Sequence, residues 1–348
     1  MKNILIEYGC PAALAEKGNL ARITAVHKER YGIVSEAGEG FAKLKSSVYY
    51  NGGAEPFPTV GDYVEIQPNP LGDSLVTRTL PRQSFFSRPD VFLATWEQAV
   101  AANFDYVFIV MSLNQNFNLR RLERYLTSAW QSGGLPVVVL TKLDLCEDPA
   151  PFICEAERIA AGAAVCAVSA LTGEGLDKLG EYLKPQKTIV FLGSSGVGKS
   201  SLTNALAGEE LMKVNAIREE DARGRHTTTH RQLLRLPNGV LVIDTPGMRE
   251  LGMWDVSEGL GEAFTDVEAF LGRCRFADCT HQNEPGCAVR AAIASGELSE
   301  SRWASYQQLK REALYSEDKG EFLRQRQAKH KAIARMVRQR KKDRRAKY

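Results

Sequence analysis

The sequence predicts a multidomain protein with an N-terminal β-barrel of the OB type, a central α/β domain and a C-terminal helical, metal-binding domain. Three observations support this division. Short β-rich runs fill residues 20–82, strands then alternate with helices to residue 255, and a Cys/His cluster lies within 274–287. Since 348 residues exceed one ordinary core, we place the domains at 1–82, 83–255 and 256–348.

Composition is that of an ordinary globular protein, with 44% hydrophobic and 25% charged residues. No apolar run approaches the length of a membrane span. The short apolar patch near Met1 is interrupted by Glu7 and lacks the organisation of a signal peptide. We therefore expect a cytoplasmic protein that has no membrane partner. A monomer is also expected.

The first predicted domain consists of short strands separated by Gly and Pro. The runs that alternate in polarity or are β-branched cover residues 19–26, 31–35, 40–44 and 61–66. Their spacing fits a small five-stranded barrel of the OB type. Such barrels often bind oligonucleotides, but a purely structural barrel has the same pattern, so both roles remain open. Residues 83–93, with Arg88 and Pro89, are expected to form a linker.

The alternation in the central domain implies a largely parallel sheet, with ligand loops at the carboxyl ends of its strands. Apolar runs predict buried strands at residues 105–111, 136–140, 164–168, 188–192 and 239–243. Residues 118–131 have apolar side chains at helical spacing. Helix-compatible stretches also follow Gly175 and Ser200.

The stretch from Gly193 to Ser200 reads G-x-x-x-x-G-K-S, the phosphate-binding loop of nucleoside triphosphatases, between a predicted strand and a predicted helix. Its glycines let backbone N–H groups approach phosphates, and the helix directs its positive end toward the same anion. Lys199 is expected to reach the β- and γ-phosphates, and the Ser200 hydroxyl to ligate Mg²⁺. The predicted nucleotide contacts are Gly193, Ser194, Ser195, Gly196, Val197, Gly198, Lys199, Ser200 and Ser201.

Two motifs at the ends of earlier strands indicate a guanine base. Residues 141–144 match [NT]-K-x-D, in which the Asp144 carboxylate accepts guanine N1–H and N2–H₂ while Lys142 lies along the base. Ser169 and Ala170 match S-A-x, in which the Ala170 N–H meets guanine O6. Thr141 replaces the commoner Asn and loses an amide that usually ties loops together, so a modest loss of base affinity is expected.

The motif at Asp244–Gly247 has the D-x-x-G pattern, in which Asp244 supports the Mg²⁺ shell and the Gly247 N–H senses the γ-phosphate. Small GTPases run from the phosphate loop through switch I, D-x-x-G and N-K-x-D to S-A-x. Here the base motifs at 141 and 169 come first, so the sequence looks like a circularly permuted GTPase. With the barrel and the Cys/His cluster, it resembles the RsgA (YjeQ) family from residue 20 to about residue 315.

The resemblance implies a GTPase of late small (30S) ribosomal subunit maturation, with the subunit and its rRNA as partners and GTP and GDP as ligands. It also implies that residues 224–230 are switch I, with Thr228, chosen by register alone, on Mg²⁺ and the γ-phosphate. Met248 stands where a Ras-like enzyme has a water-orienting Gln, so slow intrinsic turnover is expected. Orientation of the attacking water would then depend on His226, on Arg249 or on the partner. It is equally open that His226 is a plain switch-loop residue with no catalytic role.

Four potential metal ligands lie within a short stretch of the C-terminal domain: Cys274, Cys279, His281 and Cys287. Three thiolates and one imidazole form a closed set that is typical of structural zinc, and thiolate softness favours Zn²⁺. Buried thiols without a metal are the alternative. The resemblance also implies zinc. Apolar positions at helical spacing flank the cluster, namely Phe264, Val267, Phe270, Trp303, Tyr306 and Leu309.

The charge is unevenly distributed along the chain. From Arg324 to Tyr348 there are twelve Lys and Arg residues and one acid, Asp343, so this tail carries +11 while the remainder carries −8 of the net +3. A basic arm on an acidic body predicts a polyanionic partner. An RNA-docking helix, a disordered arm and a solvated charged helix share this pattern, and the scarcity of acids favours RNA.

Two hypotheses of different classes follow. One is an RNA-stimulated GTPase that checks or completes small-subunit assembly, and the other is an RNA-binding adaptor that keeps GTP as a structural ligand. Turnover with and without small subunits distinguishes them. The permuted order also implies a mechanism for the GTPase. Switch II leads into the zinc domain from about Leu251, so loss of the γ-phosphate would alter the grip of that domain on RNA.

Overall fold

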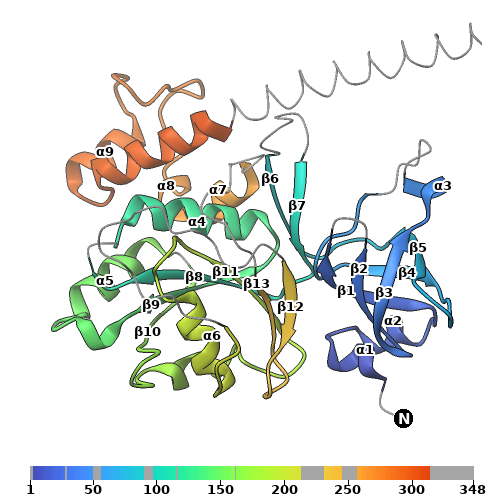
Figure 1. The fold of residues 1–348 in the computed structure, drawn as a ribbon. Helices are drawn as coiled ribbons and strands as arrows, with labels where there is room; N and C mark the ends of the chain where they lie inside the picture. The colour runs from blue at the N-terminus through green and yellow to red at the C-terminus, as the bar shows by residue number, and fades with distance from the viewer. Residues whose placement is uncertain are drawn as a thin grey trace, which may run out of the picture.

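The computed structural model describes residues 3–27, 30–49, 56–89, 97–114, 117–160, 162–212, 231–244 and 257–313. A barrel, an α/β domain and a set of C-terminal helices follow one another along the chain (Figure 1). Several positions named above lie outside the described residues, and they are switch I over 224–230, Gly247, Met248, Arg249, Leu251 and the basic tail over 324–348.

The N-terminal part is a closed five-stranded barrel, as the sequence predicts. Its strands are β1 (Leu20–Val26), β2 (Tyr31–Ser35), β3 (Gly38–Leu44), β4 (Tyr63–Gln67) and β5 (Ser74–Thr79), and its helices are α1 (Ile4–Glu7), α2 (Ala12–Ala15) and α3 (Ser46–Tyr49). The strands pair in the order β1-β2-β3-β5-β4, and β4 returns to β1 to close the barrel. No sequence-based run covers β5, because Thr77 and Arg78 interrupt its apolar pattern.

The predicted linker over residues 83–93 is wrong for residues 85–89. Strand β6 (Phe85–Pro89) pairs antiparallel with β7 (Glu97–Ala102), and the pair lies between the barrel and the α/β domain (Figure 1). Phe86 is buried and stacks on Phe104, with 4.9 Å between the ring centroids. This apolar anchor gives the segment a strand structure despite its Pro and Arg content.

The α/β domain has a sheet of six strands, β8 (Tyr106–Ser112), β9 (Leu135–Thr141), β10 (Ala164–Ala167), β11 (Thr188–Leu192), β12 (Gln232–Arg235) and β13 (Leu241–Asp244). Their order is β10-β9-β8-β11-β13-β12, and only β12 runs antiparallel to its neighbour β13. Strand β11, which leads into the phosphate loop, therefore lies between β8 and β13. Among the described residues, the phosphate loop, the two base motifs and Asp244 lie at the carboxyl ends of their strands, as the permuted motif order requires.

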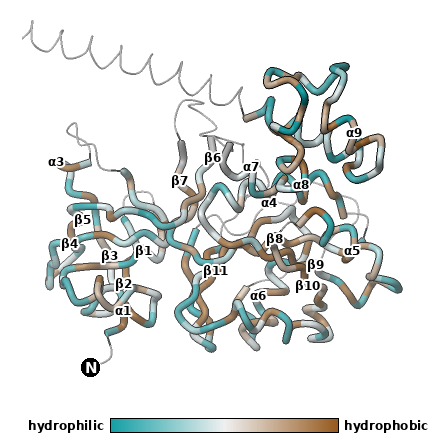
Figure 2. The backbone as a smooth tube through the Cα atoms, turned by 180° about the vertical axis from the view of Figure 1, so that it is seen from behind, coloured by the Kyte–Doolittle hydropathy of each residue, from teal (hydrophilic) through white to brown (hydrophobic). Residues whose placement is uncertain are grey.

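Helices cover both faces of this sheet (Figure 1). On one face, Leu122 and Leu126 of α4 (Leu119–Gln131) join the buried cluster that contains Ile109. On the other, Leu202 of α6 (Lys199–Ala207) joins the cluster that contains Val110. The central strands are strongly hydrophobic in Figure 2 because both of their faces are covered. The remaining elements are α5 (Ala150–Ile159) and the 3₁₀ turns η1 (Leu143–Leu145) and η2 (Leu176–Leu179).

Arg22 joins the barrel to the α/β domain. Its side chain is fully buried, and it donates to the backbone carbonyls of Tyr8, Gly61 and Asn103 at 2.5, 3.2 and 2.8 Å. Strand β1 also pairs with β12 at Ala25. Because a buried guanidinium is stable only when its donors are paired, these bonds fix the barrel against the sheet.

The C-terminal helices are α7 (Ser257–Ala263), α8 (Thr265–Glu268), α9 (Ala288–Ser295) and a helix over residues 300–313. They pack on α4, where the Gly259 N–H donates to Gln131 Oε1 at 2.7 Å and a Cβ on Gly259 would lie 2.3 Å from Thr127 O. The apolar positions predicted here are buried or partly buried in the core, namely Phe264, Val267, Phe270, Trp303, Tyr306 and Leu309. Within the described ranges, no helix is long and apolar enough to cross a membrane.

Candidate nucleotide site and metal centre

The phosphate loop connects the end of β11 to the start of α6, so the N-terminal end of that helix faces the loop. A Cβ on Gly193 would lie only 2.4 Å from Val110 O of the neighbouring strand. Gly198 precedes the helix in the left-handed conformation, with φ of 94°. These positions require glycine, because any side chain would clash or strain the backbone that forms the loop.

The Lys199 side chain lies across the phosphate loop, where its Nζ donates to Gly193 O at 2.7 Å and to Ser194 O at 2.6 Å. Asp244 ends β13, directly beside β11. Burial raises the pKa of the Asp244 carboxyl, and the positive charge of Lys199 opposes this shift. The Lys199 ammonium, which is predicted to bind phosphate, therefore lies close enough to the Asp244 carboxylate, which is predicted to support the metal, for their charges to interact.

The two base motifs also meet in space. Asp144 Oδ1 accepts a hydrogen bond of 2.5 Å from the buried hydroxyl of Ser169, which itself accepts from the backbone N–H groups of Leu171 and Thr172. Lys142, in the left-handed conformation with φ of 62°, turns the chain after β9. The Asp144 carboxylate is therefore held in place beside the loop that contains Ala170.

Thr141 joins the base side of the site to the phosphate side. Its hydroxyl lies 2.5 Å from Val197 O of the phosphate loop and 3.2 Å from Met111 O of β8. Although Thr141 lacks the expected amide, its buried hydroxyl reaches the phosphate-loop carbonyl and so ties the two loops. The modest loss of base affinity stays a prediction.

The structure describes most of the predicted site, but not all of it. Ser195 and Gly196 lie in the turn between β11 and α6, and Ser200 and Ser201 lie in the first turn of that helix. The remaining positions, Thr228, His226 and Gly247, lie outside the described residues, so their roles stay predictions.

Sequence reasoning missed one side chain at the phosphate loop. Arg121 of α4 donates from Nη1 to Ser194 Oγ at 3.3 Å. Asn118 caps this helix, since its Oδ1 accepts from the Arg121 N–H at 2.9 Å. The sequence contained one signal for this contact. Asn118 lies between a predicted strand and a predicted helix, and as the helix cap it places Arg121 in the first helical turn, at the ligand edge of the sheet.

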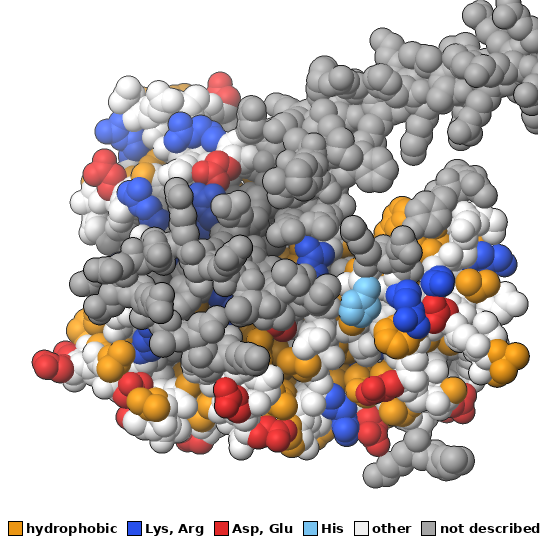
Figure 3. Space-filling model, in the orientation of Figure 1, with side chains coloured by type: hydrophobic (Ala, Val, Ile, Leu, Met, Phe, Trp, Pro, Cys, Tyr) orange, Lys and Arg blue, Asp and Glu red, His pale blue; other side chains and the backbone are white. Residues whose placement is uncertain are grey.

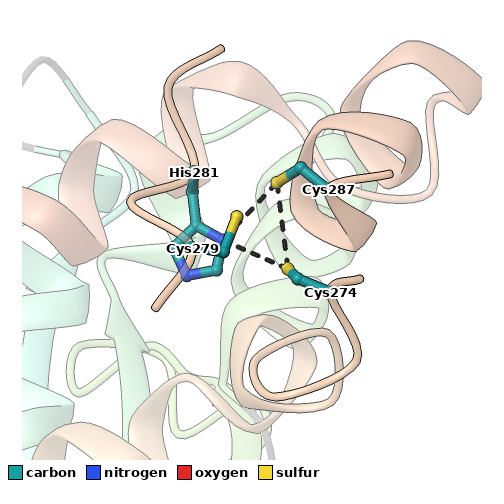
Figure 4. Close-up of side chains that lie close together, drawn as sticks. All are labelled: Cys274, Cys279, His281 and Cys287. Carbon is teal, nitrogen blue, oxygen red and sulfur yellow. Dashed lines mark hydrogen bonds between the residues drawn. The ribbon is translucent and has the colours of Figure 1, made fainter. Parts of the chain in front are cut away.

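The four predicted metal ligands converge between α8 and the start of α9, and their side chains point toward one another (Figure 4). All four ligand atoms lie within 4.8 Å of one another. His281 Nδ1 is 3.4 Å from Cys274 Sγ and 3.5 Å from Cys287 Sγ, and these two sulfur atoms are 3.9 Å apart. Cys279 completes the set.

This geometry fits a tetrahedral zinc ion. Zn–S bonds of about 2.3 Å and Zn–N bonds of about 2.0 Å place the ligand atoms of such a site roughly 3.5–3.8 Å apart. The three separations among Cys274 Sγ, Cys287 Sγ and His281 Nδ1, which are 3.4, 3.5 and 3.9 Å, lie within about 0.1 Å of this range, and all four ligand atoms lie within 4.8 Å of one another. Three thiolates and an imidazole occupy every position, so the ion would be structural and not catalytic.

The loop between the metal ligands is held by Glu284. Its carboxylate accepts from the backbone N–H groups of Thr280, Gln282 and Asn283 at 2.9, 2.9 and 3.0 Å. The hydrogen bond from the Thr280 side chain, with those from the backbone, lowers the pKa of Glu284 to about 2. The same loop places His281 in the left-handed conformation, with φ of 61°, so that its ring reaches the cysteines.

A phosphate loop at the centre of a parallel sheet, with guanine-type motifs on neighbouring strands, defines a P-loop GTPase. Because the base motifs precede the phosphate loop in the chain, the protein is a circularly permuted member of that class. The family model described as RsgA GTPase matches residues 79–254. This chain belongs to the RsgA GTPase family and is a GTP hydrolase.

Curated relatives match most of the chain. The "Small ribosomal subunit biogenesis GTPase RsgA 1" of Listeria innocua is 46% identical over 317 residues, which cover 90% of each protein. The "Small ribosomal subunit biogenesis GTPase RsgA" of Methanosarcina acetivorans is 45% identical over 266 residues, covering 76% of this chain and 72% of the relative.

Solved structures agree with this placement. YjeQ from Thermotoga maritima superposes with a TM-score of 0.63 at 30% identity, covering 85% of this chain and 98% of that protein. YloQ, described as a circularly permuted GTPase, superposes with a TM-score of 0.59 at 26% identity, covering 86% and 95%. The permuted fold that the motif order predicts is therefore confirmed.

Proposed function

We propose that this protein hydrolyses GTP to GDP and phosphate during late maturation of the small (30S) ribosomal subunit, and that the subunit stimulates this hydrolysis. The observation that carries the proposal is the continuity of the nucleotide site, in which Thr141 ties the guanine-side loop to the phosphate loop. The names of the relatives supply the biological setting. The alternative, an RNA-binding adaptor that does not hydrolyse GTP, has less support, because the family model that matches this chain is described as a GTPase.

Each residue of the site has a defined role in this proposal. The Asp144 carboxylate and the Ala170 N–H bind guanine, and Lys199 binds the β- and γ-phosphates. The Ser200 and Thr228 hydroxyls bind Mg²⁺, and Asp244 supports its shell, because hydroxyl and carboxylate oxygens are the ligands that this ion prefers. Bound Mg²⁺ supplies neutralisation of the charge that develops on the phosphates.

The C-terminal region would bind rRNA and hold one structural Zn²⁺ per chain. Its described surface carries exposed arginines, and Figure 3 shows Lys and Arg side chains on this part of the molecule. The exposed arginines are Arg273, Arg275, Arg290 and Arg311. Together with the +11 tail, they suit a polyanionic partner. We expect a cytoplasmic monomer, with no membrane partner.

Small ribosomal subunits are expected to raise the turnover of GTP by more than about tenfold, because Met248 leaves the attacking water without the side chain that orients it in related enzymes. Deletion of residues 324–348 should weaken this response, most strongly at low salt, since the binding energy that those residues gain by releasing counterions shrinks as the salt concentration rises. Turnover is measured across a subunit titration at two salt concentrations.

Large ribosomal subunits serve as the control for that titration and should give no comparable stimulation. A flat response to small subunits would refute the assembly role and favour the adaptor. A normal response from the truncated protein would instead assign RNA recognition to the barrel and the zinc-binding region.

Elemental analysis is expected to find about one zinc ion per chain, bound by Cys274, Cys279, His281 and Cys287. The double substitution Cys274→Ser/Cys279→Ser removes two thiolates, so it should abolish metal binding and lower the melting temperature. Cys154→Ser is the matched control, because Cys154 is exposed and lies outside the cluster. Zinc retained by the double variant would contradict the assignment.

A further inference from the structure

The first turn of helix α4 contacts the phosphate loop. Arg121 donates to Ser194 Oγ at 3.3 Å, and Ser194 O also accepts from Lys199 Nζ at 2.6 Å. A shift of α4 would therefore move the backbone that surrounds the phosphates. The Asn118 side chain accepts a capping hydrogen bond from the Arg121 N–H, and this bond fixes the turn that contains Arg121.

The same helix contacts the C-terminal region through the adjacent turn. Glu123 is buried and pairs with the buried Arg302 at 2.8 Å, and Arg302 also binds Asp266 at 2.9 Å. Arg124 forms a bidentate pair with Glu312, at 2.6 and 3.2 Å. Figure 1 shows α4 between the sheet and the C-terminal helices.

We propose that α4 couples the phosphate loop to the C-terminal region over residues 257–313, which contains the Cys/His cluster. Arg121 is the positioning residue, and it acts on the loop through Ser194. Arg121 and Arg124 are three positions apart, so one turn of a hydrogen-bonded helix separates the two contacts. Such a turn moves as a rigid unit. Binding at the C-terminal region would adjust the phosphate loop, and nucleotide binding would in turn adjust the C-terminal region, because coupling between two sites is reciprocal.

The first test uses the free full-length protein and measures hydrogen exchange over residues 257–313, with and without a saturating non-hydrolysable GTP analogue. We expect nucleotide to change exchange in this region of the wild type, and we expect Arg121→Gln to remove the change. Arg120→Gln is the matched control, since Arg120 is the exposed neighbour of Arg121 in the same turn. Arg121→Lys keeps a donor and a charge, and should restore part of the response.

Two results would overturn the coupling. One is an unchanged exchange pattern over 257–313 in the wild type at saturating nucleotide. The other is a response that persists in Arg121→Gln, which would leave the chain connection through residues 245–256 as the route. A double-mutant cycle with Ser194→Ala separates the contact from general destabilisation, because the two substitutions should not be additive if they remove the same bond.

The second test rests on the proposed function and measures stimulation by small subunits. Arg121→Gln is expected to lower the stimulation by about tenfold, a size typical of a lost hydrogen bond to a charged group, with subunit affinity unchanged. Glu312→Gln should lower it through the other contact. Stimulation that is intact in both variants would refute the coupling. A wild type that no subunit stimulates would refute the proposed function alone, since the exchange experiment judges the coupling independently.

Discussion

Replacement of Lys199 by Ala is expected to lower kcat/KM for GTP by about a hundredfold to a thousandfold or more, which is effectively a loss of turnover. The Lys199 ammonium lies within a loop whose backbone fixes it through Gly193 O and Ser194 O. A bound triphosphate would offer oxygens to the same donors, and these contacts would strengthen as charge moves toward the leaving group. Alanine supplies neither the charge nor the donors.

The measurement is steady-state phosphate release, with nucleotide affinity determined in parallel. Ser200→Ala should give a similar loss through the Mg²⁺ site. Lys184→Ala is the matched control and should behave as the wild type, because Lys184 is exposed outside the phosphate loop. Near-normal turnover in both Lys199→Ala and Ser200→Ala would remove the basis for the phosphate-loop assignment.

Substitution of Asp144 by Asn is expected to shift the preference from GTP to xanthosine triphosphate. The carboxylate accepts two guanine donors, and an amide can accept only with its oxygen while its NH₂ group faces a donor. Sites built on such hydrogen bonds discriminate by about 10⁴ or more against a base that leaves them unpaired. The amide matches the carbonyl that xanthine presents at this position, so the preference should reverse.

Competition binding between the two nucleotides measures this shift. Ser169→Ala removes the hydroxyl that orients Asp144, so it should weaken binding of GTP without reversing the preference. Asp177→Asn makes the same chemical change at an exposed position of η2 and should have no effect. An Asp144→Asn variant that still prefers GTP would show that residue 144 does not recognise the base.

Most of the fold and the chemistry of this protein could be predicted from local patterns. The phosphate loop and the Cys/His cluster are short stretches whose geometry depends on a few neighbouring residues, as the glycines at 193 and 198 illustrate. The buried strands were equally clear, because a strand covered on both faces is apolar throughout. Strand β5, helix α5 and strand β12 were missed, since their polarity is mixed and packing decides their structure.

By itself, the sequence determined that this protein has a permuted GTPase site with its motifs at strand ends, and which four residues gather around a metal. Only the tertiary structure showed that Thr141 ties the two halves of that site, that Arg22 fixes the barrel, and that α4 lies between the phosphate loop and the C-terminal helices. The physical reason is distance along the chain. Arg121 and Ser194 are 73 positions apart, and Arg124 and Glu312 are 188 apart, so strand order and helix packing bring them together while local propensity does not encode them.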